Sequence, residues 1–110
     1  MNNPLVSVVV PIYNMGDKIE LCVKSLLCQD YSNFEVILVD DGSQDNSLEV
    51  CNKIALTSPI VKVVHTENRG SGPARNSGID CAKGKYIYFP DADDYIEPNT
   101  LTILVRSIQQ

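Results

Sequence analysis

Aspartates gather in two short runs, each of which follows an apolar stretch. The runs are Asp40-Asp41 and Asp91-Ala92-Asp93-Asp94. Carboxylates held close together repel one another, and proteins usually retain such a group where it binds a divalent cation. Because no His or Cys cluster accompanies these acids, an oxygen-only site for Mg²⁺ or Mn²⁺ is favoured. For the second run taken alone, a turn with an aspartate cap before the next helix is the alternative.

Four apolar runs rich in β-branched residues are the predicted strands. They cover residues 6–12, 34–39, 61–65 and 86–89, so their starts are separated by 28, 27 and 25 residues. A βα unit takes roughly 30 residues, and nearly continuous apolar runs indicate parallel strands covered on both faces. We therefore predict an α/β fold, a Rossmann-like parallel sheet of about four strands flanked by helices. Ligands of such sheets bind at the carboxyl ends of the strands, where all five aspartates are expected to converge.

Apolar residues at helical spacing predict a helix after each strand. For the first helix, Asp17 and Glu20 form a predicted capping box. In the third, Gly78 would let the helix approach the sheet closely, and Gly84 would end it. The other expected boundaries are Ser43 or Asp45 as the N-cap of the second helix, Pro59 after it, Gly72-Pro73 at the start of the third and Asn99 before the fourth.

The glycine-rich segment does not match the usual phosphate-binding loops. The P-loop pattern is absent, and the dinucleotide pattern GxGxxG is broken because Arg75 stands at its last position. The segment also follows the third strand, whereas the dinucleotide pattern follows the first, so an oxidoreductase is disfavoured. A diphosphate could bind beside the aspartates only with a metal that offsets their charge. Arg69 and Arg75 would add positive charge, unless they are ordinary solvated arginines.

The bulk composition limits the classes of protein and partner. A chain of 110 residues fits one domain. It has 9 basic and 14 acidic residues, a net charge of 9 − 14 = −5, and the basic residues are scattered, so nucleic acid is not an expected partner. The apolar runs are too short to cross a bilayer and no basic leader begins the chain, so we expect a cytoplasmic fragment. The cysteines lack zinc-site spacing and are expected to be buried thiols of a reduced protein: Cys22, Cys28, Cys51 and Cys81.

Four segments together carry a resemblance to a known family. They are residues 6–14 (VSVVVPIYN), 39–43 (VDDGS), 68–78 (NRGSGPARNSG) and 86–94 (YIYFPDADD). In order and spacing they resemble the start of the inverting family 2 glycosyltransferases, whose fold is of the GT-A type. The resemblance covers nearly the whole chain. It departs from the family pattern at Pro90, where a small or apolar residue is common.

The resemblance implies roles for the residues around a nucleobase. Pro11 and Tyr13 match the first-strand loop that packs on the base, and Asp41 matches the carboxylate that accepts the imide N–H of the base, usually uracil. Asp40 would support that loop, and Arg75 would approach the base or the phosphates. The implied partner is therefore a nucleotide-sugar donor, with a UDP-sugar as the expected class.

The same resemblance places a metal at the second acidic run. Asp93 occupies the D-x-D position that ligates Mn²⁺ or Mg²⁺ held by the diphosphate, and Asp91 would face the ribose or the sugar. The implied reaction moves the sugar to an acceptor hydroxyl of a glycan or lipid-linked acceptor. Family members continue past Gln110 with the acceptor half and the general base. Residues 1–110 are thus expected to bind the donor without a catalytic base of their own, and membrane association of a longer protein remains open.

Two other classes share part of the pattern. Haloacid-dehalogenase-like phosphatases also carry D-x-D, but after the first strand and followed by Thr or Val, whereas here it follows the fourth strand and Tyr95 stands at that place. Receiver domains also combine an acidic pair with a parallel sheet, but they need a lysine after the last strand, and the last candidate in this chain is Lys85. These alternatives would be distinguished by metal-dependent UDP binding and by acetyl phosphate labelling.

Overall fold

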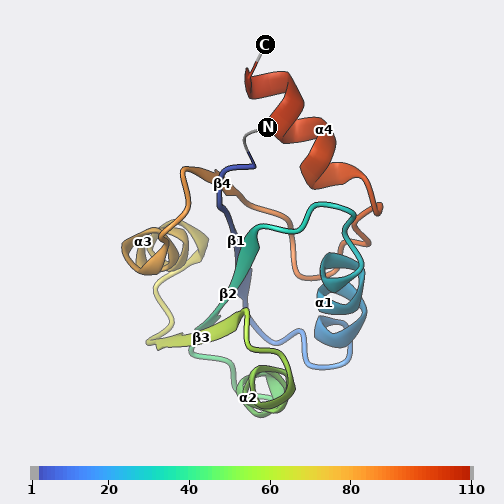
Figure 1. The fold of residues 1–110 in the computed structure, drawn as a ribbon. Helices are drawn as coiled ribbons and strands as arrows, with labels where there is room; N and C mark the ends of the chain where they lie inside the picture. Colours follow the sequence, from blue (N-terminus) through green and yellow to red (C-terminus); the bar gives the residue numbers. More distant parts are fainter. Residues whose placement is uncertain (1–2, 110) are drawn as a thin grey trace.

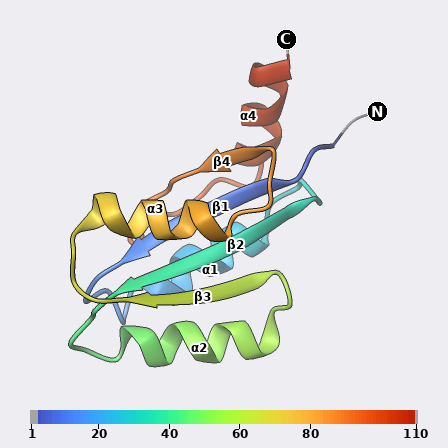
Figure 2. The same cartoon turned by 90° about the vertical axis from the view of Figure 1, so that its left-hand side faces the viewer.

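The computed structural model describes residues 3–109, in which strands and helices alternate strictly. The strands form one parallel sheet in the order β3-β2-β1-β4, so the chain crosses over the sheet between successive strands (Figure 2). The predicted α/β fold with a parallel sheet of four strands is confirmed. The elements are β1 (Val6–Ile12), α1 (Ile19–Leu27), β2 (Phe34–Asp41), α2 (Ser47–Thr57), β3 (Val61–Thr66), α3 (Ser71–Cys81), β4 (Tyr86–Tyr88) and α4 (Thr100–Gln109).

Helices cover both faces of this sheet. Helix α3 lies on one face, and α1 and α2 lie on the other (Figure 1). All eight residues of β2 are buried, which explains why its apolar run is continuous instead of alternating. Strand β2 also extends two residues beyond the predicted run, because Asp40 and Asp41 continue the ladder with β3. The two acids are therefore strand residues and not part of a loop.

Two glycines of the third crossover behave differently from each other. A Cβ on Gly78 would lie 2.3 Å from Val9 Cγ1 and 3.2 Å from Val39 Cγ2, so the predicted close approach of α3 to the sheet is confirmed. The prediction that Gly84 ends this helix is wrong, because α3 ends at Cys81 and Ala82 is already extended. Gly84 instead passes against β1, where a Cβ would lie 2.7 Å from the Ser7 nitrogen.

The predicted helix starts need correction as well. Helix α1 begins after Lys18 with no side-chain cap, so the Asp17–Glu20 capping box does not form. The N–H groups of Lys18 and Ile19 bond the Met15 carbonyl instead. Helix α2 begins after Asn46, and of the two predicted caps it is Asp45 that accepts from the first helical N–H, through its Oδ1 at 2.9 Å from the Ser47 nitrogen.

The buried carboxylate of Glu35 connects the strands near the amino end of β2, far from Asp40 and Asp41 at its carboxyl end. Glu35 accepts from the Ser7 hydroxyl at 2.6 Å, from Lys62 Nζ at 3.0 Å and from the Lys83 N–H at 2.7 Å. Burial by itself raises the pKa of Glu35, but these bonds outweigh it and hold the pKa below its usual value. The contacts join β1, β2, β3 and the approach to β4, and nothing in the sequence pattern predicted them.

The cysteines divide into two pairs. Cys22 and Cys51 are buried, as predicted, whereas Cys28 and Cys81 are exposed, so the expectation of four core thiols is wrong for half of them. Burial, followed by the charges of nearby aspartates, raises the pKa of Cys22 to about 11 and that of Cys51 to about 12. Both buried thiols are therefore protonated at neutral pH and poor nucleophiles.

Helix α4 lies beside β4, near the end of the sheet where the strands begin (Figure 2). Its Leu101 and Val105 are buried in the core, whereas Ile103 and Ile108 are about half exposed. Over residues 3–109, no helix is both long enough and apolar enough to span a bilayer.

Candidate functional site

A cavity of about 200 Å³ lies at the carboxyl ends of β1 and β2, beside the start of α3. This is the edge at which parallel α/β sheets bind their ligands. The cavity brings together three predicted residues: Pro11 within β1, Tyr13 directly after β1, and Asp41 at the end of β2. Its remaining lining, which the sequence motifs contained but to which no role was given, is Ile12, Asn68, Gly70, Ser71 and Ala74.

Asp41 is 4% exposed and held by three donors. Its Oδ1 accepts from Thr66 Oγ1 and from the Arg69 N–H, both at 3.0 Å, and its Oδ2 accepts from the Gly70 N–H at 2.9 Å. Burial raises the pKa of this carboxyl, but the bonds from Arg69, Gly70 and Thr66 outweigh burial and lower it overall. The group is therefore ionised at neutral pH, and Oδ2 still has capacity for one more donor.

Two glycines make this approach of the chain to Asp41 achievable. Gly70 has φ of +102° at the start of α3, a conformation that a side chain rarely tolerates. Gly42 has φ of +69°, and a Cβ there would lie 2.6 Å from the Asn68 nitrogen. The β3–α3 segment can therefore pass close enough to donate two backbone N–H groups to one carboxylate.

Asp40 points to the opposite face of the sheet and is fully buried. Its Oδ2 lies 2.9 Å from His65 Nδ1, and the two residues are ladder partners between β2 and β3. Within residues 3–109, Oδ1 of Asp40 has no hydrogen-bond partner. The pairing with His65 was not predicted, and counting from the strand starts would not have given it, because Asp40 lies six residues after Phe34 whereas His65 lies four residues after Val61.

The second acidic run forms a separate, exposed cluster. Asp91, Asp93 and Asp94 each offer a carboxylate oxygen, and these oxygens lie within 4.8 Å of one another. The run forms a tight turn in which Asp94 Oδ2 accepts from the Asp91 N–H at 3.0 Å. A set of three carboxylates without nitrogen or sulfur ligands suits a hard divalent cation. Asp94, for which no metal role was predicted, belongs to this set together with Asp93.

The five aspartates thus lie in two groups instead of one. Asp40 and Asp41 occupy successive positions of β2, so their side chains alternate between its faces, and both are engaged by neighbouring strands or loops. The three acids after β4 remain exposed. The predicted convergence of all five into one acidic cluster is corrected accordingly.

Arg75 projects from the first turns of α3 toward the end of β4. Its guanidinium carbon lies 5.9 Å from the centre of the Phe89 ring, within the range of a cation–π contact. It does not line the small cavity. Because Phe89 and Pro90 lead directly into the acidic cluster, this contact places a positive charge beside the residues that precede the cluster.

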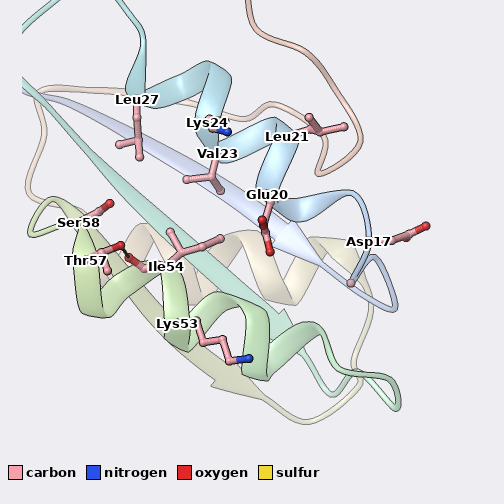
Figure 3. A pocket seen from close by; sticks show the side chains of 11 residues that line it. Asp17, Glu20, Leu21, Val23, Lys24, Leu27, Lys53, Ile54, Thr57 and Ser58 are labelled. Atoms are coloured by element: carbon pink, nitrogen blue, oxygen red, sulfur yellow. Dashed lines mark hydrogen bonds between the residues drawn. The ribbon is translucent and has the colours of Figure 1, made fainter.

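A larger cavity, of about 540 Å³, lies elsewhere, in a groove between α1 and α2 (Figure 3). It is lined by the apolar residues Leu21, Val23, Leu27 and Ile54 and by the charged residues Glu20, Lys24 and Lys53. No residue predicted to bind a ligand or a metal reaches it. The smaller cavity is the better candidate site, because an ionised carboxylate and an aromatic side chain both line it.

Comparison with known proteins identifies the family. The sequence model described as "Glycosyl transferase family 2" matches residues 7–110. Glycosyltransferase GlyG of Streptococcus pneumoniae serotype 4 is 47% identical over 107 residues, which are 96% of this chain and 36% of GlyG. The chain spans 29 to 36% of the first four curated relatives that it matches, about a third of their length.

Solved structures show the same fold. S. aureus TarS (residues 1–349) in complex with UDP-GlcNAc superposes with a TM-score of 0.84 at 36% identity, over 94% of this chain and 31% of that one. The mannosyltransferase PcManGT from Pyrobaculum calidifontis, in complex with GDP-Man and Mn²⁺, gives 0.79 at 33% identity over 84% and 28%. The GT-A fold expected from the motifs is confirmed, and the chain belongs to glycosyl transferase family 2.

Proposed function

We propose that this chain binds the donor of a metal-dependent, inverting glycosyl transfer, and that the donor is a nucleoside diphosphate sugar of the UDP class. The observation that carries the proposal is the small cavity at the carboxyl edge of the sheet, where Pro11, Tyr13 and Asp41 meet. Family membership and the nucleotide sugars bound by TarS and PcManGT support it.

The nucleobase would occupy the cavity beside Asp41. The ring of Tyr13 is 40% exposed and offers a flat apolar surface. Uracil presents an imide N–H, and the remaining acceptor capacity of Asp41 Oδ2 suits that donor. Because the carboxylate is already held by three bonds, it is fixed before the base arrives, and little ordering remains to be done on binding.

The diphosphate would extend toward the exposed acids. Asp93, with Asp91 and Asp94 beside it, would hold Mn²⁺ or Mg²⁺, while Asp91 would also face the ribose or the sugar. Bound there, the ion would offset the charge of the diphosphate and stabilise it as a leaving group. Arg75, placed next to Phe89, would add a second positive charge. A chain of net charge −5 needs such charges to bind a polyanion.

The acceptor side lies outside these assignments. We propose that the 110 residues bind the donor without transferring its sugar, since none of the assigned residues is positioned as a base for an acceptor hydroxyl. In a longer protein the acceptor would be a glycan or a lipid-linked sugar, and the second kind would bring the enzyme to the cytoplasmic face of a membrane.

Calorimetry with UDP and CDP tests the proposal. We expect UDP to bind in the presence of Mn²⁺ and binding to weaken strongly in EDTA. CDP should bind more weakly than UDP, because cytosine presents a ring-nitrogen acceptor where uracil presents an N–H, and that acceptor would face the Asp41 carboxylate. Absence of UDP binding would refute the donor site, and equal binding with and without EDTA would refute the metal.

A further inference from the structure

The two loops on either side of the cavity bond to each other through side chains. The Asn14 N–H donates to Ser43 Oγ at 3.0 Å, and the Gln44 N–H donates to Asn14 Oδ1 at 2.8 Å. We call Asn14, Ser43 and Gln44 the loop clamp. Both bonds join the loop after β1 to the loop after β2. The bonded residues are 29 positions apart in sequence for Asn14 and Ser43, and 30 for Asn14 and Gln44. The exchange is reciprocal, so both the backbone and the side chain of Asn14 are engaged.

Asn14 also has an unusual backbone. Its φ is +52°, and within residues 3–109 no other residue except glycine has a positive φ. Asparagine tolerates this left-handed conformation better than most residues, but it still persists only where its surroundings fix it. The two clamp bonds supply such surroundings, because they hold the N–H and the side-chain oxygen of the same residue.

A second set of bonds continues the connection toward the helices. The Met15 N–H donates to Ser47 Oγ at 2.9 Å, and the Gly16 N–H donates to Asp45 Oδ2 at 3.3 Å. Asp45 in turn accepts from the Ser47 N–H and hydroxyl through its Oδ1. The loops are in close contact here, since a Cβ on Gly16 would lie 2.0 Å from Asn46 Oδ1. Three successive N–H groups of the first loop, those of residues 14–16, are thus bound by side chains of the second loop or of the first residue of α2.

We propose that Asn14 is a positioning residue of the nucleobase site, acting through the loop clamp. Tyr13 directly precedes Asn14, and Asp41 lies two residues before Ser43. The clamp therefore links the chain just beyond the proposed stacking ring to the chain just beyond the proposed imide acceptor, and it fixes the position of one relative to the other. This inference rests on the proposed donor site. It adds that bonds which touch no ligand fix the stacking ring relative to the acceptor.

The variants separate the side-chain bonds from the backbone conformation. Asn14→Gly removes the Oδ1 acceptor but keeps a residue that accepts positive φ. Ser43→Ala removes the other acceptor without changing the backbone preference at residue 14. Asn14→Asp retains both an acceptor oxygen and tolerance of positive φ, and serves as the rescue variant. The matched control is Asn33→Gly, which deletes an exposed asparagine whose Nδ2 donates to the Asn3 carbonyl at 2.9 Å, away from the cavity.

Calorimetry would measure UDP with Mn²⁺, and Mn²⁺ with pyrophosphate, on each variant. We expect Asn14→Gly and Ser43→Ala each to weaken UDP binding about tenfold, the equivalent of one net hydrogen bond. The affinity for Mn²⁺ with pyrophosphate should stay within about twofold, because the acidic cluster lies outside the clamp. Asn14→Asp should recover most of the UDP affinity, and Asn33→Gly should match the wild type.

Three results would overturn the proposal. UDP affinity unchanged in both clamp variants would show that the nucleobase site does not depend on these bonds. UDP and pyrophosphate affinities that fall together, or unfolding of both variants in far-UV circular dichroism, would make the clamp a general structural element. If the wild-type protein itself fails to bind UDP, the proposed donor site is wrong and the clamp has no role in it. If the wild type binds UDP and the variants bind it equally well, only the clamp is refuted.

Discussion

Replacing Asp41 by asparagine tests whether this carboxylate organises the proposed nucleobase cavity before any ligand arrives. The change keeps the size and shape of the side chain and removes its charge. One oxygen becomes an NH₂ group, while three donors still surround the site: Thr66 Oγ1, the Arg69 N–H and the Gly70 N–H. The asparagine can satisfy the two donors that now share Oδ1. Its NH₂ group would then face the Gly70 N–H at 2.9 Å, and two donors would oppose each other.

The expected cost follows from these contacts. A hydrogen bond to a charged group contributes about 1.5 to 3 kcal/mol, and a buried donor left without its acceptor costs about 1 to 3 kcal/mol. Since Asp41 is 4% exposed, water from the cavity replaces the lost acceptor only in part. We expect Asp41→Asn to lower the free energy of unfolding by about 2 to 3 kcal/mol at pH 7. The control Asp80→Asn, at an exposed position of α3, should change it by less than about 0.5 kcal/mol.

The difference should also depend on pH. The pKa of Asp41 in the folded protein is lowered, because the three bonds outweigh burial. A lowered folded pKa stabilises the protein above the unfolded pKa of about 3.9, and that stabilisation is lost as the pH falls through the folded value. The gap between wild type and Asp41→Asn should therefore be full at pH 7 and smaller near pH 3. Other carboxylates titrate in both proteins and cancel in the difference.

Urea unfolding at the two pH values, followed by circular dichroism, measures both effects. A loss below about 0.5 kcal/mol at pH 7 would show that Asp41 does not hold the β3–α3 segment. A loss of the same size at pH 7 and pH 3 would show that charge has no part in it. Either result would contradict the account of the cavity as a site fixed before binding.

Three further outcomes are expected. Asp93→Asn should abolish the extra rise in melting temperature that UDP and Mn²⁺ together give over the sum of each alone. The melting temperature without ligands should stay equal or rise slightly, because one member of a repelling acidic cluster is removed. A retained extra rise would exclude Asp93 as the metal ligand. Gly78→Ala should destabilise the protein by about 1 to 3 kcal/mol in urea unfolding, since the new Cβ would lie 2.3 Å from Val9 Cγ1, and unchanged stability would mean that α3 shifts freely on the sheet. Incubation of the 110 residues with a UDP-sugar and a sugar acceptor should give no transfer product by mass spectrometry, because no acceptor-side base has been assigned, and turnover at ordinary enzymatic rates would contradict that expectation.

The order of strands and helices could be predicted from the sequence because it depends on local burial. Apolar runs at regular intervals located all four strands, and β1 begins and ends at the predicted residues. Gly78 was predicted correctly for a similar reason, since a glycine inside an apolar helix face signals close packing. The family followed from four motifs whose order and spacing are properties of the chain alone.

The partners of the polar side chains could not be predicted in this way. Asp40 and Asp41 are neighbours in sequence, yet one pairs with His65 and the other with the start of α3, because successive strand residues face opposite sides of the sheet. The Asp17–Glu20 capping box failed because the chain before α1 forms a turn on Met15. Glu35 and the loop clamp were missed since their partners lie 27 to 48 residues away.

The sequence by itself determined which segments become strands and helices, and which residue types reach the carboxyl edge of the sheet. Only the tertiary structure decided that two of the five aspartates are buried and bonded while three stay exposed beside one another. Apolar periodicity reports how deeply each residue is buried, and that is a local property. Which donor faces a given carboxylate depends on how strands and loops cross in space, and hydrogen bonds of about 3 Å are decided by that geometry alone.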